Sequence, residues 1–488
     1  MVLSFVLLWV CFCLLLFFMR THRPKNFPPG PQPLPVFGNL LQLNLENPII
    51  DLNKLSDRYG KVFSIYFGSR PAVIITGFEA MKEALVTKAV DFAGRPSGLL
   101  LSDLTRGKGI IMAPHGPSWK EHRRFALMSL RNFGLGKQSM EERVLGEVSY
   151  VCDHLEKHAG ELIDPQTLFH NASCDIICSI MYGARYEYDH EFFQAQIKIM
   201  SDNSKIANGP WGMIYDTIPL LRSLPLPFQN PLRDYRTVKM NVLEIVNEHR
   251  LSRTPNEPRD IIDGYLDEMD RRGEDCAPFD EDNLLTMLLD LLFAGTDTTS
   301  NTIRAAVLYL MAYPDMQERC QQEIDSVLDG KEAVSFEDRY RMPFVQAFIH
   351  ESQRAASTLP LSVYHCTTRD TELTGYHIPK GTLVIQNLTS ALVEEKQWKH
   401  PHGFHPENFL NEQGEFVKPP AFMPFSIGPR TCLGEGLARM ELYLILTTLM
   451  HRFQFIWPEG AGEPDFTPVF GVTQAPKPYK MIVKLRRK

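Results

Sequence analysis

A single cysteine near the carboxyl end lies in a setting that suits a metal ligand. The segment FSIGPRTCLGEG places Cys432 between Gly428 and Gly434, which lack the side chains that would hold a ligated group away. A helix that begins after Gly434 would direct its first N–H groups toward the sulfur and stabilise a thiolate. Arg430 adds a fixed positive charge that suits a carboxylate. On this segment alone, a buried structural cysteine is the competing interpretation.

A second group of polar residues interrupts a long apolar run. AGTDTTS, residues 294–300, places hydroxyls and a carboxylate where their burial is unfavourable unless they are paired. Threonines that bond back to helix carbonyls would make this segment a satisfied kink. The functional alternative is a groove opened at Gly295, from which Asp297 and Thr298 relay protons to a bound group.

A third group is the pair Glu351 and Arg354 in FIHESQR, on a helix that Pro343 is suited to open. Three residues apart, the two side chains share a helical face and can form an ion pair. Most such pairs are solvent-exposed and contribute well under about 1 kcal/mol. The proline-bounded segment FHPENF, residues 404–409, is expected to pack against this pair and hold it in place.

The elements that must position these residues are mostly helices, with a few short strands. The clearest helix begins at Asp280 or Asp282, both good N-cap residues, and ends before Pro314. About thirty residues make it roughly 45 Å long. It is apolar on most faces, which predicts central burial, and charged residues within it, such as Asp290, disfavour a second membrane span. Strands are predicted for an early hairpin, KVFSIYFGSRPAVIITG, and for the segments ELTGYHIPKGTLVIQN and YKMIVKL.

Composition narrows the class of protein. The chain has 488 residues, a net charge of -7 and nine cysteines. This charge disfavours a nucleic-acid-binding protein. Apart from Cys11 and Cys13, the cysteines lie at least four residues apart, and without a CxxC pair they indicate neither a zinc site nor a redox dithiol. Such a dispersed set is typical of a reducing compartment.

Residues 1–20 are predicted to anchor the protein in a membrane. The run from Val2 to Met19 carries no charge, and Arg20, Arg23 and Lys25 follow it. With no basic segment before the run and no cleavage site after it, a retained signal anchor is favoured over a removed signal peptide. The flanking charges place the rest of the chain in the cytosol. The predicted divisions are an anchor over 1–20, a basic, proline-rich hinge over 21–38 and one catalytic domain over 39–488.

Together these motifs resemble those of the cytochrome P450 superfamily, most closely its microsomal vertebrate family-two members, which oxidise drugs and fatty acids. The motifs stand in the family's order, the resemblance covers the whole chain, and FxxGxRxCxG is a highly specific pattern. The matching residues are Trp119 and Arg123 (WxxxR), Ala294, Gly295, Asp297 and Thr298 (AGxDT), Glu351 and Arg354 (ExxR), and Phe425, Gly428, Arg430, Cys432 and Gly434 (FxxGxRxCxG).

The resemblance implies the cytochrome P450 fold, mainly α with small β-sheets, a single amino-terminal anchor helix and haem b. It implies that Cys432 is the axial thiolate of the haem iron and that Asp297 and Thr298 deliver protons. Glu351 and Arg354 would brace the haem-binding loop. The family usually completes that brace with arginine or histidine where this chain has Asn408, so a weaker brace is expected. The residues implied for the haem propionates are Trp119, Arg123 and Arg430, with Arg95 and His365 as further candidates.

The family's substrate pocket, placed on this chain, is apolar and favours lipophilic substrates such as xenobiotics, fatty acids or steroids. Asp290 lies one helical turn before Ala294. It either pairs with a substrate amine or caps loop amides, and both interpretations stay open. The expected substrate-lining residues are Asp290, Phe293, Ala294, Leu359, Val363 and Phe470.

Electrons are expected from a separate protein, because the sequence shows no flavin-binding domain. Lys120, Arg124 and Arg131 are either a solvated run of charge or a basic face for an acidic NADPH–cytochrome P450 reductase. Cytochrome b5 is an optional second partner. The irregular apolar segment 209–228 is expected to dip into the bilayer rather than form a buried lid. The resemblance thus implies an endoplasmic reticulum membrane protein that binds lipid and lipophilic substrate, with its catalytic domain in the cytosol.

Three classes of function are consistent with a haem thiolate. A monooxygenase inserts one oxygen atom into a lipophilic substrate with electrons from NADPH through a reductase. An isomerase or dehydratase acts on a peroxide without a reductase and usually lacks the acid–threonine pair, which Asp297 and Thr298 supply here. A non-enzymatic haem sensor would carry a regulatory domain, whereas the chain reads as one domain. The sequence therefore favours the monooxygenase.

Overall fold

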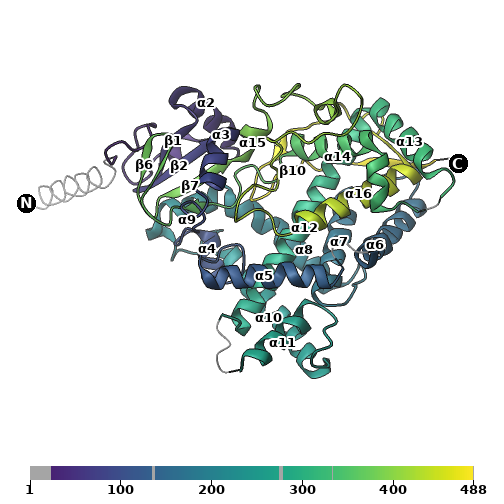
Figure 1. Cartoon of the computed structure of the whole chain (residues 1–488), viewed down its shortest axis with the longest axis horizontal. Helices are drawn as coiled ribbons and strands as arrows, with labels where there is room; N and C mark the ends of the chain where they lie inside the picture. Colours follow the sequence, from purple (N-terminus) through teal and green to yellow (C-terminus); the bar gives the residue numbers. More distant parts are fainter. Residues whose placement is uncertain (1–22, 135–137, 274–277, 332, 487–488) are drawn as a thin grey trace, which may run out of the picture.

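The computed structural model describes residues 23–134, 138–273, 278–331 and 333–486. It is mainly helical with small sheets, as the sequence predicts. Figure 1 shows the largest sheet toward the amino-terminal end of the molecule, with helices filling the rest. The expected anchor, residues 1–20, lies outside the described residues. Within those ranges, no helix is both long and apolar enough to cross a membrane.

Several helices begin with proline at the first helical position, where its missing N–H leaves no helical hydrogen bond unmade. The α-helices are α2 (Ile49–Tyr59), α3 (Phe78–Lys82), α4 (Leu100–Thr105), α5 (Pro117–Asn132), α6 (Gln138–Lys157), α7 (Pro165–Met181), α8 (Glu191–Asn208), α9 (Pro210–Thr217), α10 (Gln229–Ser252), α11 (Ile261–Arg272), α12 (Glu281–Ala312), α13 (Pro314–Leu328), α14 (Pro343–Ala356), α15 (Leu388–Leu392) and α16 (Glu435–Arg452). Shorter helical turns are η1 (Leu40–Gln42), η2 (Glu83–Thr87), η3 (Pro219–Leu221), η5 (Phe336–Arg341) and η6 (Pro406–Phe409).

The largest sheet has four strands in the order β1-β2-β7-β4, and only its central β2–β7 pair is parallel. The hairpin β1–β2 and the strands β5, β6, β7 and β11 fall in the segments predicted from the sequence. The strands are β1 (Val62–Phe67), β2 (Arg70–Thr76), β3 (Leu162–Ile163), β4 (His365–Cys366), β5 (Thr371–Leu373), β6 (Tyr376–Ile378), β7 (Leu383–Asn387), β8 (Phe453–Ile456), β9 (Pro468–Val469), β10 (Ala475–Pro476) and β11 (Met481–Leu485). The smaller sheets are β3-β11-β8, β9-β10 and β5-β6.

The described part of the proline-rich segment packs against the sheet. The N–H of Ser64 in β1 donates to the carbonyl oxygen of Pro29 at 2.7 Å, and its hydroxyl donates to that of Pro28 at 2.8 Å. A Cβ on Gly30 would lie 1.9 Å from the carbonyl oxygen of Ser64. These contacts join the segment to the body of the protein.

Helix α12 runs through the middle of the molecule (Figure 1) and is buried along most of its 32 residues. The side chain of Asp280 caps it by accepting from the N–H of Asn283 at 2.7 Å. Its most extensive packing is against α7. There a Cβ on Gly295 would lie 3.0 Å from Cγ1 of Ile177, so glycine lets the two helices approach closely. The helix continues through Gly295 without a break.

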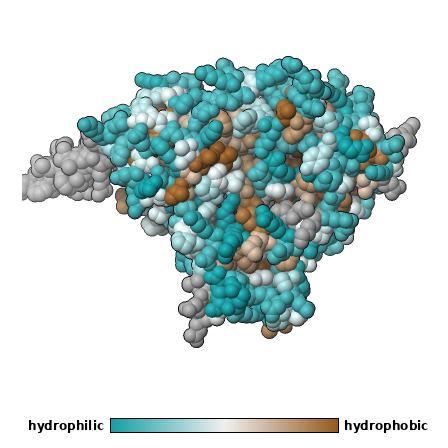
Figure 2. Space-filling view, viewed as in Figure 1, coloured by the Kyte–Doolittle hydropathy of each residue, from teal (hydrophilic) through white to brown (hydrophobic). Residues whose placement is uncertain are grey.

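The main apolar core lies around α6, α7, α12 and α16, and a second core lies beside the largest sheet. Figure 2 shows that hydrophilic side chains cover most of one face of the molecule, with apolar residues in separate patches. Burial of this helical core supplies the main driving force for the fold.

The pair predicted from FIHESQR forms in the interior. Nε and Nη2 of Arg354 donate to the two carboxylate oxygens of Glu351, each at 2.7 Å. Both side chains are almost fully buried, at 1% and 0% exposure. Arg354 also donates to the carbonyl oxygens of Leu392, Pro401 and Gly403. The pair therefore joins α14 to the long irregular segment that precedes the Cys432 loop.

Glu351 in turn holds η6, as expected for FHPENF. It accepts from the main-chain N–H of His405 at 2.7 Å and from Nδ2 of Asn408 at 3.3 and 3.4 Å. Asn408 makes shorter hydrogen bonds, of 2.8 Å, with the main chain of His400. Asn408 thus makes long hydrogen bonds to the Glu351–Arg354 pair and shorter ones within its own segment, to His400.

Removal of one partner should show how much this buried pair contributes. Arg354→Ala would leave a buried carboxylate without its partner, which costs about 3–5 kcal/mol. We expect the midpoint temperature of thermal unfolding to fall strongly. The matched control is Arg271→Ala. Arg271 pairs with Glu268 at the same i, i+3 spacing but at the surface, so this substitution should leave the midpoint temperature nearly unchanged. Equal effects in the two variants would show that the Glu351–Arg354 pair is not a structural brace.

Candidate active site

A cavity of about 250 Å³ lies between α5, α12, α16 and the loop that leads into α16. Residues from distant parts of the sequence meet in its lining. The residues singled out from the sequence that line it are Arg95, Trp119, Arg123, Asp290, Ala294, Gly295, Thr298, Leu359, Val363, Phe425, Arg430, Cys432 and Gly434. Those that lie outside its lining are Phe293, Asp297, Glu351, Arg354, His365, Gly428 and Phe470.

The loop that carries Cys432 is closed by its own backbone and docked on a distant helix. The N–H of Cys432 donates to the carbonyl oxygen of Phe425 at 2.9 Å. Gly428 has a φ of +82°, and a Cβ there would lie 1.9 Å from the carbonyl oxygen of Leu85. Glycine is therefore required at this position by both conformation and packing.

The thiol of Cys432 faces the cavity, and its surface is exposed toward that space. Burial raises its pKa, while the N–H groups of Gly434 and Glu435 and the charge of Arg123 oppose that rise. The helix amino terminus thus acts as predicted but does not outweigh burial. A metal cation bound to the sulfur would outweigh the effect of burial, because a coordinated thiol is deprotonated.

Three arginines lie close together at this cavity without matching carboxylates. Burial, together with the charges of Arg95 and Arg123, lowers the pKa of Arg430 to about 8. Burial also lowers the pKa of Arg95 to about 9. Of the described residues that line the cavity, only Asp290 and Glu441 carry carboxyl groups. An anionic group bound among the arginines would relieve this repulsion.

Main-chain carbonyl oxygens hold these arginines in place. Arg430 donates to Ala93, Ile110 and Ala113 at 3.0, 3.3 and 2.7 Å, and its guanidinium carbon lies 3.9 Å from the ring centre of Trp119. These contacts use three of its five N–H groups, so two can reach a ligand. The other propionate candidates also donate to carbonyl oxygens: Arg95 to Ile111, Val363 and Tyr364, Trp119 to Ile110, Arg123 to Thr431, and His365 to Phe92.

His365 is buried, and its Nδ1 donates to the carbonyl oxygen of Phe92. Burial and the charges of Arg95 and Arg430 hold the pKa of His365 well below its usual value, so the imidazole is neutral. His365 does not line the cavity, so its predicted contact with the propionates stays a prediction.

Asp297 and Thr298 occupy different faces of α12. Thr298 lines the cavity, and its hydroxyl donates back to the carbonyl oxygen of Ala294 at 2.6 Å, the satisfied arrangement considered from the sequence. Asp297 faces elsewhere: it accepts a hydrogen bond from Thr473 and lies 3.2 Å from Nε2 of His170. Successive residues on a helix point about 100° apart, which separates the two side chains.

Asp290 caps the loop before α5. Its Oδ2 accepts from the N–H groups of Ile110 and Ile111 at 2.7 and 2.9 Å. Burial raises the pKa of Asp290 to about 7, although these two hydrogen bonds and Arg95 oppose the rise. The capping interpretation is therefore present in the structure. Because Asp290 also lines the cavity, amine binding stays a prediction.

Glu441 is a cavity residue that the sequence analysis missed. It lies on α16, where burial raises its pKa to about 8 while the hydroxyl of Thr299 opposes the rise. The available signal was a lone carboxylate inside the apolar run LARMELYLIL. That signal was insufficient because the sequence does not show which helix covers this face.

Haem b fits this arrangement of residues. A soft thiolate suits its iron, the arginines suit its two carboxylates, and apolar residues such as Ile110, Ala294 and Leu437 suit its macrocycle. A mainly helical fold with such a cysteine loop beside an apolar cavity defines the class of haem-thiolate proteins.

Comparison with known proteins identifies the family within this class. The cytochrome P450 family model matches residues 28–483. Cytochrome P450 2F2 of Mus musculus is 42% identical over 464 residues, which cover 94% of each chain. Cytochrome P450 2D10 of Mus musculus is 40% identical over 490 residues, 99% of this chain and 97% of that protein. Cytochrome P450 2C3 of Oryctolagus cuniculus is 40% identical over 96% of each chain. This chain belongs to the cytochrome P450 family and is a haem b monooxygenase.

The close approach at Gly428 should be essential for the haem site. Gly428→Ala combines a left-handed backbone, which is unfavourable by about 1–2 kcal/mol for other residues, with a clash against Leu85. We expect lower thermal stability and a several-fold loss of bound haem, measured by absorbance per protein. Gly414→Ala is the matched control, because Gly414 has a φ of +79° but no neighbour within 4 Å of an added Cβ. If the control loses as much haem, the contact with Leu85 is not the cause.

Proposed function

We propose that this monooxygenase acts on lipophilic substrates, namely xenobiotics, fatty acids or steroids, with electrons from NADPH through a flavoprotein reductase. The balanced reaction is RH + O2 + NADPH + H⁺ → ROH + H2O + NADP⁺. The observation that supports it is an apolar cavity whose lining brings together the Cys432 thiol and the Thr298 hydroxyl. Cys432 would hold the haem, which would supply the dioxygen and electron chemistry of this reaction.

The chain's own residues have distinct parts in this proposal. Cys432 binds the iron, and the arginine group with Trp119 holds the haem carboxylates. Thr298 presents a hydroxyl to the cavity, and Asp297, the preceding residue on α12, is the source of its protons. The apolar walls, which include Leu359 and Val363, exclude water and orient the substrate.

The basic side chains of α5 support docking of a reductase. Lys120, Arg124 and Arg131 are exposed, whereas Trp119 on the same helix is buried beside the cavity. An acidic partner bound here would lie one helix away from the haem site. Complementary charge mainly raises the association rate, so this docking should weaken at high salt. Cytochrome b5 is a second acidic partner for the same face.

Exposed apolar residues support contact with a membrane, which we propose to be the endoplasmic reticulum. In the segment 209–228, Trp211, Leu220 and Leu224 are exposed, and Leu220 reaches 88% exposure. Val36 is also exposed, and its carbonyl oxygen lies beside that of Thr217 at Gly68. Amphipathic surfaces of this kind bind at the lipid interface, which favours a bilayer contact over a buried lid.

Oxygen labelling tests the proposed reaction. The holoenzyme, mixed with reductase and NADPH, is incubated under ¹⁸O2 with a panel of fatty acids, steroids and drugs. We expect products that carry one ¹⁸O atom and depend on both reductase and NADPH. Cys432→Ser is the control, and it should lose product together with the red-shifted absorbance of the reduced carbonyl complex that marks a thiolate ligand. Unlabelled product, or product without reductase, would contradict the proposal.

A second test concerns substrate charge. Asp290→Asn should weaken the binding of amine substrates by at least about tenfold relative to neutral analogues, since a hydrogen bond to a charged group contributes roughly 1.5–3 kcal/mol. Because the pKa of Asp290 is about 7, wild-type affinity for amines should rise from pH 6 to pH 8 as the carboxyl ionises. Titration of the haem absorbance measures both. An equal loss for amines and neutral analogues would leave loop capping as the role of Asp290.

A further inference from the structure

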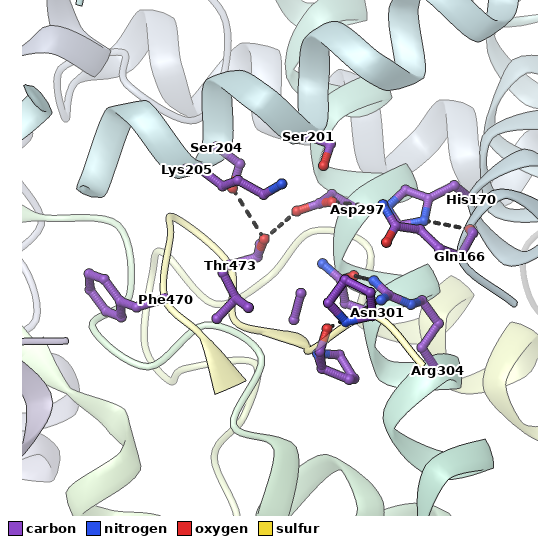
Figure 3. A pocket seen from close by; sticks show the side chains of 14 residues that line it. Gln166, His170, Ser201, Ser204, Lys205, Asp297, Asn301, Arg304, Phe470 and Thr473 are labelled. Atoms are coloured by element: carbon purple, nitrogen blue, oxygen red, sulfur yellow. Dashed lines mark hydrogen bonds and ion pairs between the residues drawn. The ribbon is translucent and has the colours of Figure 1, made fainter. Parts of the chain in front are cut away.

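A second, polar pocket of about 80 Å³ lies between α7, α8, α12 and the carboxyl-terminal segment 469–478. Asp297 lines this pocket and not the Cys432 cavity. Figure 3 shows polar side chains from separate elements converging around that carboxylate. Those that carry the argument are His170, Ser204, Lys205, Asp297, Arg304 and Thr473.

The contacts of His170 place it where it can exchange a proton with Asp297. Nδ1 of His170 lies 2.9 Å from the carbonyl oxygen of Gln166, which can only accept, so Nδ1 carries a proton. Nε2 lies 3.2 Å from Oδ1 of Asp297. That contact is a hydrogen bond only when one proton lies between the two atoms, either on the imidazole or on the carboxyl group. The pair therefore stores one transferable proton.

A chain of hydroxyl groups reaches the other oxygen of Asp297. Thr473 donates to Oδ2 of Asp297, and its oxygen lies 3.3 Å from Oγ of Ser204. Since a hydroxyl has one hydrogen and Thr473 directs it at Asp297, Ser204 is the donor to Thr473. Figure 3 shows Ser204, Thr473 and Asp297 in a row, with His170 beyond Asp297. Ser204 is only partly buried, so this chain begins close to the surface.

The pocket can supply water to these groups. Its volume has room for several water molecules, because each needs about 10–15 Å³. Nε of Arg304 is buried there with no hydrogen-bond partner among the described residues, and such donors commonly hold ordered water. Lys205 is exposed at the same pocket. Asp297 is the single carboxylate among the described residues of the lining, so these two cations stabilise it after it gives up a proton.

We propose that this pocket is where the enzyme takes up protons, and that His170 and Thr473 resupply Asp297 from it. The inference rests on the proposed function, in which RH + O2 + 2e⁻ + 2H⁺ → ROH + H2O consumes two protons. Asp297 loses its proton toward Thr298, the next residue along α12, on the cavity side. This is the proton that Asp297 shares with Nε2 of His170. The Thr473 hydroxyl then donates its proton to Asp297, and Ser204 and water in the pocket restore the protons of Thr473 and His170.

The test compares two oxidants on the holoenzyme. With reductase, NADPH and O2, turnover needs protons. With iodosylbenzene, RH + PhIO → ROH + PhI needs none. His170→Gln keeps a side-chain amide that can donate to Asp297 but cannot release a proton. We expect its NADPH-driven turnover to fall at least about tenfold, because positioned proton donors contribute roughly 10²–10⁴-fold, with more of the O2 released as hydrogen peroxide. Its turnover with iodosylbenzene should stay within about twofold of wild type.

The chain offers a matched control. His249 has the same two contacts, with the carbonyl oxygen of Ile245 four residues earlier and with Oδ2 of Asp260, each at 2.8 Å. It joins α10 to α11, in the part of the molecule that projects downward in Figure 1, and it does not line the Cys432 cavity. His249→Gln should leave both reactions within about twofold of wild type, since only a structural contact is lost.

Thr473→Val keeps the side-chain shape and tests the hydroxyl chain if His170→Gln does not fold. We expect it to lower NADPH-driven turnover several-fold and to spare the iodosylbenzene reaction. Unchanged NADPH-driven turnover in a folded variant, or an equal loss with both oxidants, would overturn the inference. A wild-type enzyme that is active with iodosylbenzene but makes no product with reductase and NADPH would instead overturn the proposed function, and the inference with it.

Discussion

The long helix α12 buries polar groups in the middle of the protein, and several of them take hydrogen-bond partners from other parts of the chain. Asp290 takes its partners from the loop before α5, and Asp297 takes them from α7 and the carboxyl-terminal segment. Arg304 donates to the carbonyl oxygen of Pro476 and to Asn301. These contacts fix the helix in rotation, so that Thr298 faces an apolar cavity while Asp297 faces a polar pocket.

The buried arginines beside the cavity also depend on partners from distant parts of the chain. Carboxylates would neutralise Arg95 and Arg430, but main-chain carbonyl oxygens hold them in place instead. The burial cost is visible in the lowered pKa of Arg430, at about 8. Charge kept uncompensated in this way is available to an anionic cofactor. The haem would therefore stabilise the fold as well as supply the chemistry, because its binding relieves a repulsion built into the protein.

Local patterns predicted much of this molecule. Alternating β-branched and aromatic residues predicted the hairpin β1–β2, and an N-cap aspartate with a following proline predicted the bounds of α12. The spacing of Glu351 and Arg354 predicted an ion pair, although not its almost complete burial. Asp290 was left with two interpretations, and the structure shows that one carboxylate can cap the loop and still face the cavity. For Asp297 the type of chemistry was predicted but its surroundings were not.

What the sequence determined by itself was the set of elements, the cysteine loop and the residues able to do chemistry, because these depend on neighbours within a few positions. Tertiary structure alone decided which groups face each other. The carbonyl oxygen of Ile110 accepts from both Trp119 and Arg430, and His170 meets Asp297 across two packed helices. Every residue has the same main-chain carbonyl group, so the sequence does not show which one accepts a given hydrogen bond. The rotation of a buried helix about its axis is set by packing on all its sides. For that reason the acid of α12 was recognised from its motif, and the pocket it faces became visible only in the folded chain.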